Sequence, residues 1–375
     1  MTDWQYLDFE DVFEDVTRHF VKIATNDYKT EGRYAIVDQS QQFIAGYTDL
    51  DLPEQIEQSQ FIVFGDHTRV FKFIDFKFFI GADGVKVLQP KIESDTKYLY
   101  HLLNSLVIEN NGYSRHFKFL KRHQILVPPL AEQKRIAAIL DKADEIRRKR
   151  EQTIAKLDQL AQSIFVEMFG DAATNPKKWP CIKLSELIKT GPQNGLYKPS
   201  NDYGSGTFIL RIDAFYDGVV TKIDNLKRVR LSENEISLFG LNKEDIVINR
   251  VNSLDYLGKS ALIPQLKEPT VFESNMMRFA VDVNLLEPLY LVTFLQSKFI
   301  KNQILSCAKN AVNQSSINQQ DVKGFLVNLP PLSLQKNFVK RKQAIEKLKY
   351  ENIAALTKQT QLFASLQHQA FTGNL

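Results

Sequence analysis

The chain has 375 residues, of which 43% are hydrophobic and 11% aromatic; this is typical of proteins that bury a core and argues against a disordered or fibrous chain. Its 48 Lys and Arg and 44 Asp and Glu give a net charge of +4, which permits a nucleic-acid partner without requiring one. Cys181 and Cys307 are too few for a disulfide framework and suit a reducing cytoplasm, and we expect neither a signal peptide nor a membrane helix.

The first part of the chain has the pattern of a mixed α+β domain. Short runs rich in Phe, Val and Ile are separated by Gly65, Gly81 and Gly84, as strands joined by tight turns would be. The predicted strands are 61–64, 70–74, 78–80 and 85–88, and a short helix is expected at 96–110.

A long helix is predicted from residue 130 to residue 169. Apolar residues recur there at spacings of three and four, which indicates an amphipathic helix or a coiled-coil seam. Pro128 and Pro129 suit its start, and Gly170 suits its end. Forty residues at about 1.5 Å each make a rod of roughly 60 Å.

The second half repeats this plan in expanded form. Residues 329–336 resemble residues 127–134, and the match continues to the end of the chain at an offset of 202 positions. Strand-like runs at 207–212, 218–231, 245–251, 260–266 and 270–283 precede a helix at 287–305 and a second long helix at 332–371. Each seam has a polar residue at its middle, Arg150 or Asn352, which can fix the register of paired helices.

This repeat predicts an α+β fold with two globular α/β domains and two long helices. The predicted parts are a first globular domain at 1–126, a helical region at 127–170, a second globular domain at 171–328 and a second helical region at 329–375.

Motifs for autonomous catalysis are incomplete. Gly258-Lys259-Ser260 ends like a phosphate loop, but the first glycine of that motif is replaced by Ser253, so a turn is the better interpretation. The six histidines show no metal-ligand spacing, and a Cys/His nucleophile pair has nothing in its favour. The two Pro-Pro-Leu segments lack the flanking residues of an amino-methyltransferase motif and are interpreted as helix starts. We therefore expect no catalytic residue, no metal and no cofactor in this chain.

Polar clusters in loops indicate a binding surface instead. Arg, Asn, Gln, His and Ser are the side chains that contact base edges and phosphates, although any one cluster taken alone is better interpreted as a solvated loop. Similar clusters in both halves favour binding. The candidate DNA contacts are Arg33, Gln39, Gln41, Tyr47, His67, Thr68, Arg69 and Lys72 in the first half, and Asn194, Tyr197, Lys198, Asn249, Arg250, Asn252, Ser253, Lys259, Asn313 and Gln314 in the second.

These residues together resemble the specificity subunit of type I restriction-modification systems. The resemblance rests on Pro-Pro-Leu-Ala-Glu-Gln-Lys-Arg-Ile at 128–136 with the helix after it, on Gly-Asp-His-Thr-Arg at 65–69, and on Asp-Ile-Val-Ile-Asn-Arg at 245–250. It covers essentially the whole chain. The second helix departs from the pattern, because it begins Ser-Leu-Gln-Lys-Asn in place of Ala-Glu-Gln-Lys-Arg.

The resemblance implies that the two helices pair as an antiparallel coiled coil and that each domain reads one half of a bipartite DNA site. It also implies a non-catalytic, cytoplasmic prokaryotic subunit that binds two modification subunits and then restriction subunits, which would hold S-adenosylmethionine, ATP and Mg²⁺. The candidate helix and partner contacts are Gln133, Arg135, Ile139, Ile146, Arg150, Leu157, Gln335, Phe338, Leu348, Asn352 and Leu356. The alternative is a coiled-coil adaptor without sequence-specific DNA binding.

The charge is distributed unevenly. Residues 1–126 hold 14 basic and 19 acidic side chains, so a DNA-binding first domain must gather its positive charge on one face, with Arg33, Arg69 and Lys72 as candidates. The basic run at 147–150 could be a solvated helix face or a contact with nucleic acid or a partner. We expect the subunit alone to bind DNA modestly and in a salt-sensitive way.

Overall fold

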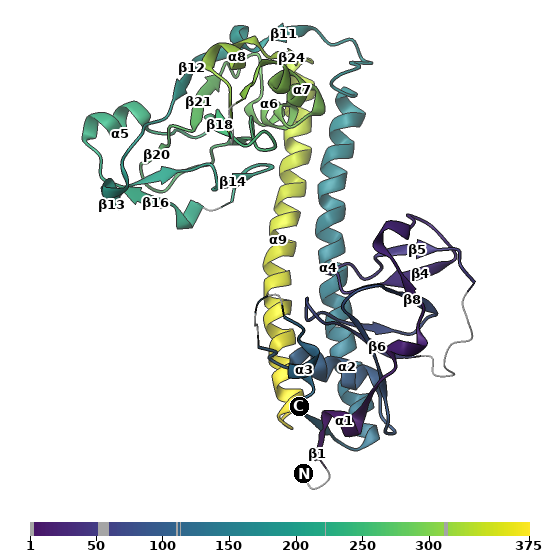
Figure 1. Cartoon of the computed structure of the whole chain (residues 1–375). Helices are drawn as coiled ribbons and strands as arrows, with labels where there is room; N and C mark the ends of the chain where they lie inside the picture. The colour runs from purple at the N-terminus through teal and green to yellow at the C-terminus, as the bar shows by residue number, and fades with distance from the viewer. Residues whose placement is uncertain (1–3, 52–59, 110–111, 113, 222, 311–313) are drawn as a thin grey trace. The chain divides into compact units, whose positions relative to one another are not determined.

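A computed structural model of the chain describes residues 4–51, 60–109, 112, 114–221, 223–310 and 314–375 (Figure 1). The chain divides into two compact units. Unit 1 contains residues 1–154 and 351–375, and unit 2 contains residues 155–350. The division falls inside the two long helices, so each unit holds one globular part and a portion of both helices. The domain boundaries predicted from the sequence stay a prediction.

The strands of unit 1 form small sheets. One has the order β2-β9-β6-β7, a second the order β3-β8-β4-β5, and β1 pairs with β10. The strands predicted at 61–88 are confirmed, since the Phe-rich and Val-rich runs bury both faces of their strands. The bounds are β1 Gln5–Asp8, β2 Phe13–Asp15, β3 Lys22–Ile23, β4 Tyr34–Val37, β5 Gly46–Thr48, β6 Phe61–Gly65, β7 Phe71–Ile74, β8 Phe78–Gly81, β9 Val85–Pro90 and β10 Gln124–Val127.

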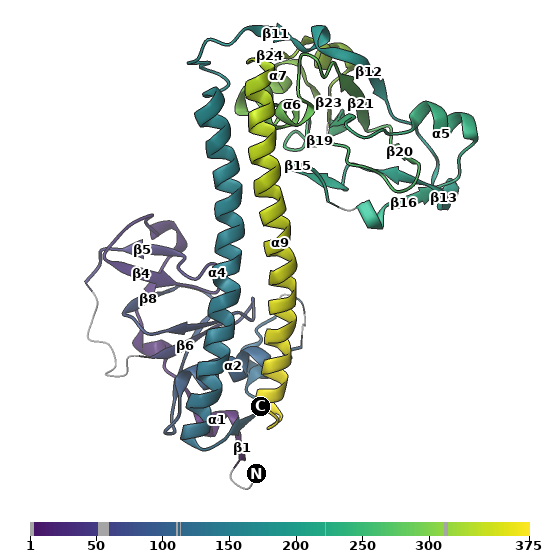
Figure 2. The ribbon, with the colours of Figure 1, turned by 180° about the vertical axis from the view of Figure 1, so that it is seen from behind.

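Three helices of unit 1 lie in its globular part, α1 (Phe9–Val12), α2 (Thr96–Ser105) and α3 (Phe117–Leu120), and α4 (Leu130–Phe169) begins in this unit. Helix α2 begins with Asp95 as its N-cap, whose carboxylate accepts the Tyr98 N–H at 2.8 Å. Tyr98 is fully buried, and its hydroxyl donates to the Leu126 carbonyl at 2.9 Å. This face of α2 packs on α4 in one hydrophobic core. Figure 2 shows the ribbons of α2 and α4 from behind.

Unit 2 repeats this arrangement with a larger sheet. The order β12-β21-β17-β19-β15-β14 includes the counterpart of β2-β9-β6-β7, and β11 pairs with β24 as β1 pairs with β10. The bounds are β11 Cys181–Lys183, β12 Ile188–Asn194, β13 Tyr203–Leu210, β14 Phe215–Tyr216, β15 Gly218–Val220, β16 Lys227–Val229, β17 Ile246–Asn249, β18 Val251–Asn252, β19 Ser260–Leu262, β20 Thr270–Phe272, β21 Met276–Val281, β22 Lys309–Asn310, β23 Ser315–Ser316 and β24 Leu326–Asn328.

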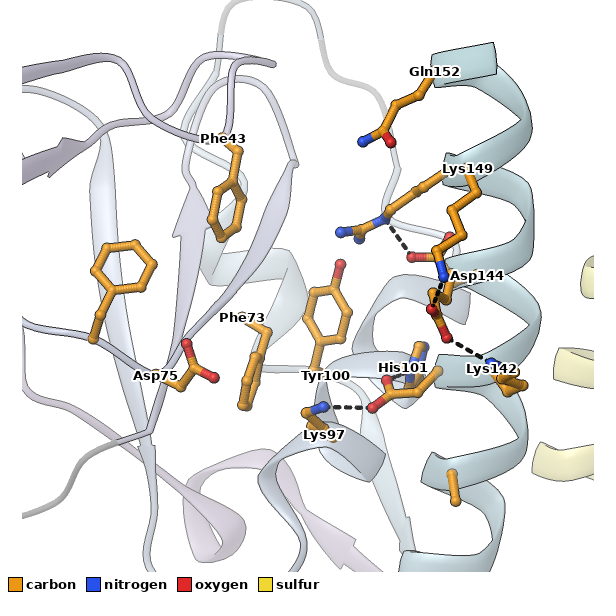
Figure 3. Close-up of a pocket in the computed structure, with 15 residues that line it drawn as sticks. Phe43, Phe73, Asp75, Lys97, Tyr100, His101, Lys142, Asp144, Lys149 and Gln152 are labelled. Carbon is orange, nitrogen blue, oxygen red and sulfur yellow. Dashed lines mark hydrogen bonds and ion pairs between the residues drawn. The ribbon is translucent and has the colours of Figure 1, made fainter.

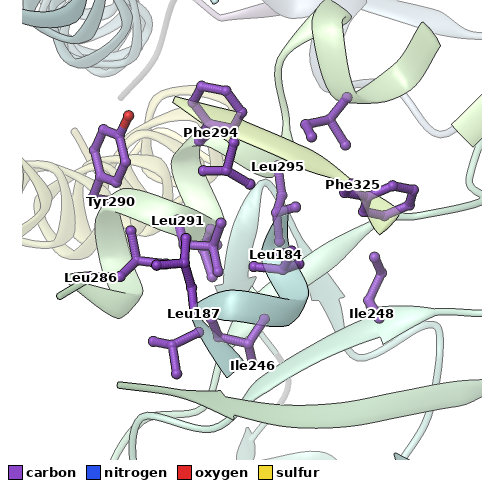
Figure 4. Close-up of a cluster of buried hydrophobic side chains, with 14 of the residues drawn as sticks. Leu184, Leu187, Ile246, Ile248, Leu286, Tyr290, Leu291, Phe294, Leu295 and Phe325 are labelled. Atoms are coloured by element: carbon purple, nitrogen blue, oxygen red, sulfur yellow. The ribbon is translucent and has the colours of Figure 1, made fainter. Parts of the chain in front are cut away.

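The helices of unit 2 include α5 (Glu233–Phe239), α6 (Pro288–Leu295), α7 (Lys298–Cys307) and α8 (Gln319–Gly324). The single helix predicted at 287–305 is wrong: the chain breaks at Gln296, and the Ser297 hydroxyl caps the new helix α7. The core in Figure 4 gathers Leu184, Leu187, Ile246 and Ile248 against Leu291 and Phe294 of α6.

The two long helices have the predicted bounds, with α4 at Leu130–Phe169 and α9 at Leu332–Phe371. Within unit 1, Arg150 Nη1 donates to Asn352 Oδ1 at 2.7 Å, so the two predicted polar seam residues contact each other. Within unit 2, Phe338 is fully buried against Phe165 and Phe169, with ring centroids 5.3 and 5.4 Å apart. Early residues of one helix meet late residues of the other in both units, which is antiparallel pairing.

Candidate nucleic-acid interface

In unit 1, the turn that joins β6 to β7 carries three predicted DNA contacts, His67, Thr68 and Arg69. The Gly65 N–H donates to the Val70 carbonyl at 2.8 Å, and the Arg69 N–H donates back to the Gly65 carbonyl at 2.7 Å. These bonds hold Arg69 in the left-handed conformation at φ 62°, which non-glycine residues rarely adopt. The turn is thus fixed by its own backbone at the end of a buried strand.

The neighbouring loop at 38–42 is fastened to this turn. The Thr68 hydroxyl donates to the Gln39 carbonyl at 2.6 Å, and the His67 N–H donates to Gln39 Oε1 at 3.3 Å. Lys72 is only 3% exposed, and its ammonium donates to the Asp38 and Gln42 carbonyls at 2.7 and 2.5 Å. Burial lowers the pKa of Lys72, and Asp38 opposes that shift. Lys72 therefore supports the loop from inside and presents no charge at the surface.

A third segment, before α3, anchors the same turn. The His116 N–H donates to the Asp66 carbonyl at 2.9 Å, and the His116 ring donates from Nδ1 to the same oxygen at 2.9 Å. The buried Asp66 carboxylate accepts the Phe117 N–H at 2.7 Å. Hydrogen bonds therefore connect three segments into one cluster, here called the first turn cluster: loop 38–42, turn 66–69 and segment 114–117.

Unit 2 has the same cluster after its central strand β17. The Arg250 carbonyl accepts the Ile317 N–H at 2.9 Å, as the Asp66 carbonyl accepts the His116 N–H. Arg250 Nη1 donates to the Ser274 carbonyl at 3.0 Å, and Asn252 in β18 pairs with Ser315 in β23. The second turn cluster is the name used below for three segments, the turn at 250–253, the turn at 273–276 and the segment at 314–317. By this correspondence, segment 114–116 is the counterpart of segment 315–317.

This correspondence adds residues that the sequence pattern did not indicate. Asn313 and Gln314 were predicted in the second half but nothing was predicted at 114–116, because the aligned blocks of the repeat do not include these loops. Asn313 lies outside the described residues, and Gln314 is exposed. Ser114 and Arg115 join the candidate surface, and the signal that could have found them is their place just before a short helix and the last strand of their domain.

The other predicted contacts of unit 2 differ in accessibility. Tyr197 is 78% exposed, and Asn194 and Ser253 are also exposed. Asn249 is fully buried, so its amide does not face solvent. The Lys259 ammonium donates to the Ile212 carbonyl at 2.9 Å and lies 3.7 Å from the centre of the Tyr216 ring.

Lys198 forms an ion pair with Glu235 at 2.7 Å. The hydrogen bond from Lys198 and that from the Ser232 N–H lower the pKa of Glu235 to about 2. This ion pair holds the start of α5 beside the loop that carries Tyr197, and it neutralises the charge of Lys198.

Two predicted contacts of unit 1 lie away from the first turn cluster. Arg33 forms an exposed ion pair with Asp51 at 3.1 Å, and its N–H donates to Asp49. Tyr47 lies in β5, where its backbone pairs with Ala35 and Lys29. The structure therefore gathers Gln39, Gln41, His67, Thr68, Arg69 and Lys72 but not Arg33 and Tyr47.

The helix contacts repeat almost bond for bond. Gln133 Nε2 donates to the Pro128 carbonyl at 2.8 Å and its Oε1 accepts the Asp95 N–H at 3.0 Å. Gln335 does the same with the Pro330 carbonyl and the Glu287 N–H, both at 2.8 Å. Each buried Gln thus joins the start of a long helix to the start of a domain helix.

The remaining helix candidates vary in burial. Arg135 pairs with Glu132 at 2.7 Å and donates to the Leu375 carbonyl at 2.7 Å. Ile139, Leu157 and Leu356 are half-buried, whereas Ile146 and Leu348 are 43% and 49% exposed. Partly exposed apolar residues on a helix are available to a partner.

A cavity of about 660 Å³ lies in unit 1 between α4 and aromatic side chains that include Phe43, Phe73 and Tyr100 (Figure 3). Several of its charged side chains are paired with one another, for example Lys97 with Asp141 at 2.6 Å. Among the described residues, no group of three or more His, Cys, Asp or Glu is placed to hold a metal, and no helix is long and apolar enough to span a membrane.

Comparison with known proteins identifies the family. A family model described as the type I restriction modification DNA specificity domain matches residues 1–159 and 176–360. The EcoKI specificity subunit of Escherichia coli (strain K12) is 30% identical over 271 residues, which cover 67% of this chain and 57% of that subunit. The putative MjaX specificity subunit of Methanocaldococcus jannaschii is 31% identical over 167 residues, which cover 44% and 39%. The chain thus spans less than two thirds of the length of these relatives.

Solved structures agree on the fold. The S subunit of a type I restriction-modification system from M. genitalium has a TM-score of 0.62 at 15% identity, with 98% of this chain and 96% of that one covered. A chain from a structural study of type I R-M assembly and conformational transition has a TM-score of 0.54 at 17% identity, with 100% and 99% covered. The α+β fold with two domains and packed long helices is confirmed. The chain belongs to the family of type I restriction-modification DNA specificity subunits.

Proposed function

We propose that this chain is the subunit that selects the DNA sequence for a type I restriction-modification complex, each globular domain reading one half of a bipartite, asymmetric site. The observation that carries the proposal is the duplication of the turn cluster. In both domains a buried central strand ends in a polar turn, and a hydrogen bond of 2.9 Å joins that turn to a corresponding segment further along the chain. Two equivalent rigid surfaces on one chain suit two half-sites.

Rigidity matters because base discrimination depends on geometry. Each correctly read base pair contributes about 1–3 kcal/mol, so a few base pairs in one domain discriminate weakly, and two linked domains add their contributions. The accessible members of the two clusters are the proposed contacts with bases and phosphates: Gln39, Gln41, His67, Thr68, Arg69, Arg250, Asn252, Ser253 and Gln314, with Asn194 and Tyr197 beside the second cluster. Lys72 and Asn249 act from the interior.

The chain does no chemistry in this proposal. It acts in the prokaryotic cytoplasm, where two modification subunits bind to it and methylate adenine with S-adenosylmethionine. Restriction subunits that use ATP and Mg²⁺ then join the complex. The partly exposed apolar residues of α4 and α9, such as Ile146 and Leu348, are the proposed contacts with these partners.

The test is to express this chain with its modification subunits in a host free of other methylation and to map methylated adenines across the genome. A two-part motif that appears only when this chain is present supports the proposal. The same motif from the modification subunits alone would overturn it and leave the structural adaptor as the better explanation.

A further inference from the structure

Fewer than half of the fourteen basic side chains at residues 1–126 form ion pairs with carboxylates among the described residues. Six basic side chains of this net-acidic region form ion pairs with carboxylates at 2.6–3.7 Å. They are Lys29, Arg33, Lys72, Lys86, Lys97 and Lys121. Two of these, Arg33 and Lys72, were predicted as DNA contacts, so their charge does not supply the basic face that a DNA-binding domain needs.

Four of the basic side chains that form no ion pair with a carboxylate among the described residues lie in or beside the first turn cluster. Arg69 lies on the turn of the first turn cluster, and Arg115 is exposed on the segment that the Asp66 hydrogen bonds hold against that turn. Lys118 and Arg122 follow on the same segment, where their charges lie 4.9 and 5.1 Å from the centre of the Phe119 ring. Residues 101–126 hold four basic side chains and a single acidic one, Glu109.

The same cluster holds polar atoms with incomplete hydrogen bonding. His116 is 0% exposed, and with Nδ1 bonded to the Asp66 carbonyl, its Nε2 has no hydrogen-bond partner among the described residues. Within the described part of the chain, Arg69 Nε and Ser114 Oγ are also buried atoms without a partner, although Arg69 Nη1 donates to the Ile108 carbonyl at 3.1 Å. Unpaired buried polar groups are rare in folded proteins, and a missing ligand is one explanation for them.

We propose that Arg69, Ser114 and Arg115 form a phosphodiester-binding site through which the first domain grips the DNA backbone. Lys118 and Arg122 extend it along the strand, and His116 is a positioning residue that fixes the segment to the turn. A hydroxyl and a guanidinium are the usual donors to phosphate oxygens. The site rests on the proposed function, and it places the DNA strand without reading its sequence.

Arg115→Gln tests the site, because Arg115 is exposed and its replacement should leave the core of unit 1 intact. The complex with its modification subunits is titrated with its cognate duplex and with a scrambled duplex across a range of salt concentrations. We expect equal weakening on both duplexes and a slope of log K against log salt that is less steep by about 0.9, the effect of one lost phosphate contact. Arg69→Gln added to this variant should lower the slope again by about the same amount.

Two variants serve as controls. Lys77→Gln removes an exposed basic residue beyond the opposite end of β7 and should leave the slope unchanged, whereas Arg115→Lys should largely retain it. An unchanged slope in Arg115→Gln, or weakening confined to the cognate duplex, would overturn the phosphate site while the proposed function stands. If the unsubstituted complex binds neither duplex, the proposed function fails together with the site.

Discussion

The paired glutamines offer the sharpest test of how each domain is attached to its helix. Gln335 is fully buried, its Oε1 accepts the Glu287 N–H, and its Nε2 donates to the carbonyls of Pro330 at 2.8 Å and Leu285 at 3.2 Å. Gln335→Ala leaves these three backbone groups without that partner. At about 1–3 kcal/mol for each buried group, with partial relief by water, the unfolding free energy of unit 2 should fall by about 3 kcal/mol.

The chain carries a convenient reporter for each unit. Of its two tryptophans, Trp4 belongs to unit 1 and Trp179 to unit 2. Urea unfolding of Gln335→Ala is followed by tryptophan fluorescence in a Trp4→Phe background, so that the signal comes from unit 2. Gln133→Ala in a Trp179→Phe background makes the matching measurement on unit 1, where two equivalent hydrogen bonds are lost.

Gln361 provides the control, because it is exposed on α9 and belongs to neither attachment. Gln361→Ala should change the unfolding free energy by less than about 0.5 kcal/mol. If Gln335→Ala also lowers the unfolding free energy by less than about 0.5 kcal/mol, the glutamines do not fasten the domains to the helices.

Three further predictions follow from the structure. Lys342 is 8% exposed, donates to Thr293 Oγ1 at 2.8 Å, and has its pKa lowered by burial. Lys342→Met should therefore stabilise unit 2 by about 1 kcal/mol in urea unfolding, whereas Met at the exposed Lys340 should not. Burial raises the pKa of Asp141, but hydrogen bonds from Lys97 and His101 outweigh it and hold that pKa below its usual value. A carboxyl whose pKa is lower in the folded than in the unfolded chain stabilises the folded protein at pH values above its unfolded pKa, near 3.9. Asp141→Asn should therefore lower the unfolding free energy at pH 7, and this loss should disappear as the pH falls below about 4. A loss of unfolding free energy that stays constant down to pH 3 would contradict this. Removing seven residues from each long helix shortens both helices by about 10.5 Å, the length of roughly three base pairs. The spacer of the methylated motif should then shorten, or methylation should cease. An unchanged motif would contradict the idea that helix length sets the spacer.

The long helices were predictable because nothing interrupts their periodicity. Leu130 and Leu332 follow Pro-Pro pairs, and the structure begins both helices there. Helix α6 was harder to predict, because the break at Gln296 depends on Ser297 capping a new helix, and a hydroxyl at one position is a weak signal inside an apolar run.

The recognition loops were only partly predictable. Residue type selected Thr68 and Arg69 correctly as members of one polar turn, but it could not distinguish an exposed Lys from Lys72, whose ammonium lies under its own loop. Ser114 and Arg115 were missed because their counterpart at 315–316 becomes apparent only when the sheets of the two units are compared.

The most direct test of the central claim changes one domain at a time. Thr68→Ala in the first turn cluster and Asn252→Ala in the second are each expressed with the modification subunits, and the methylated adenines are mapped. We expect each substitution to relax or abolish recognition of one half of the motif and to leave the other half intact. Loss of both halves from either substitution, or an unchanged motif from both, would contradict the assignment of one half-site to each domain.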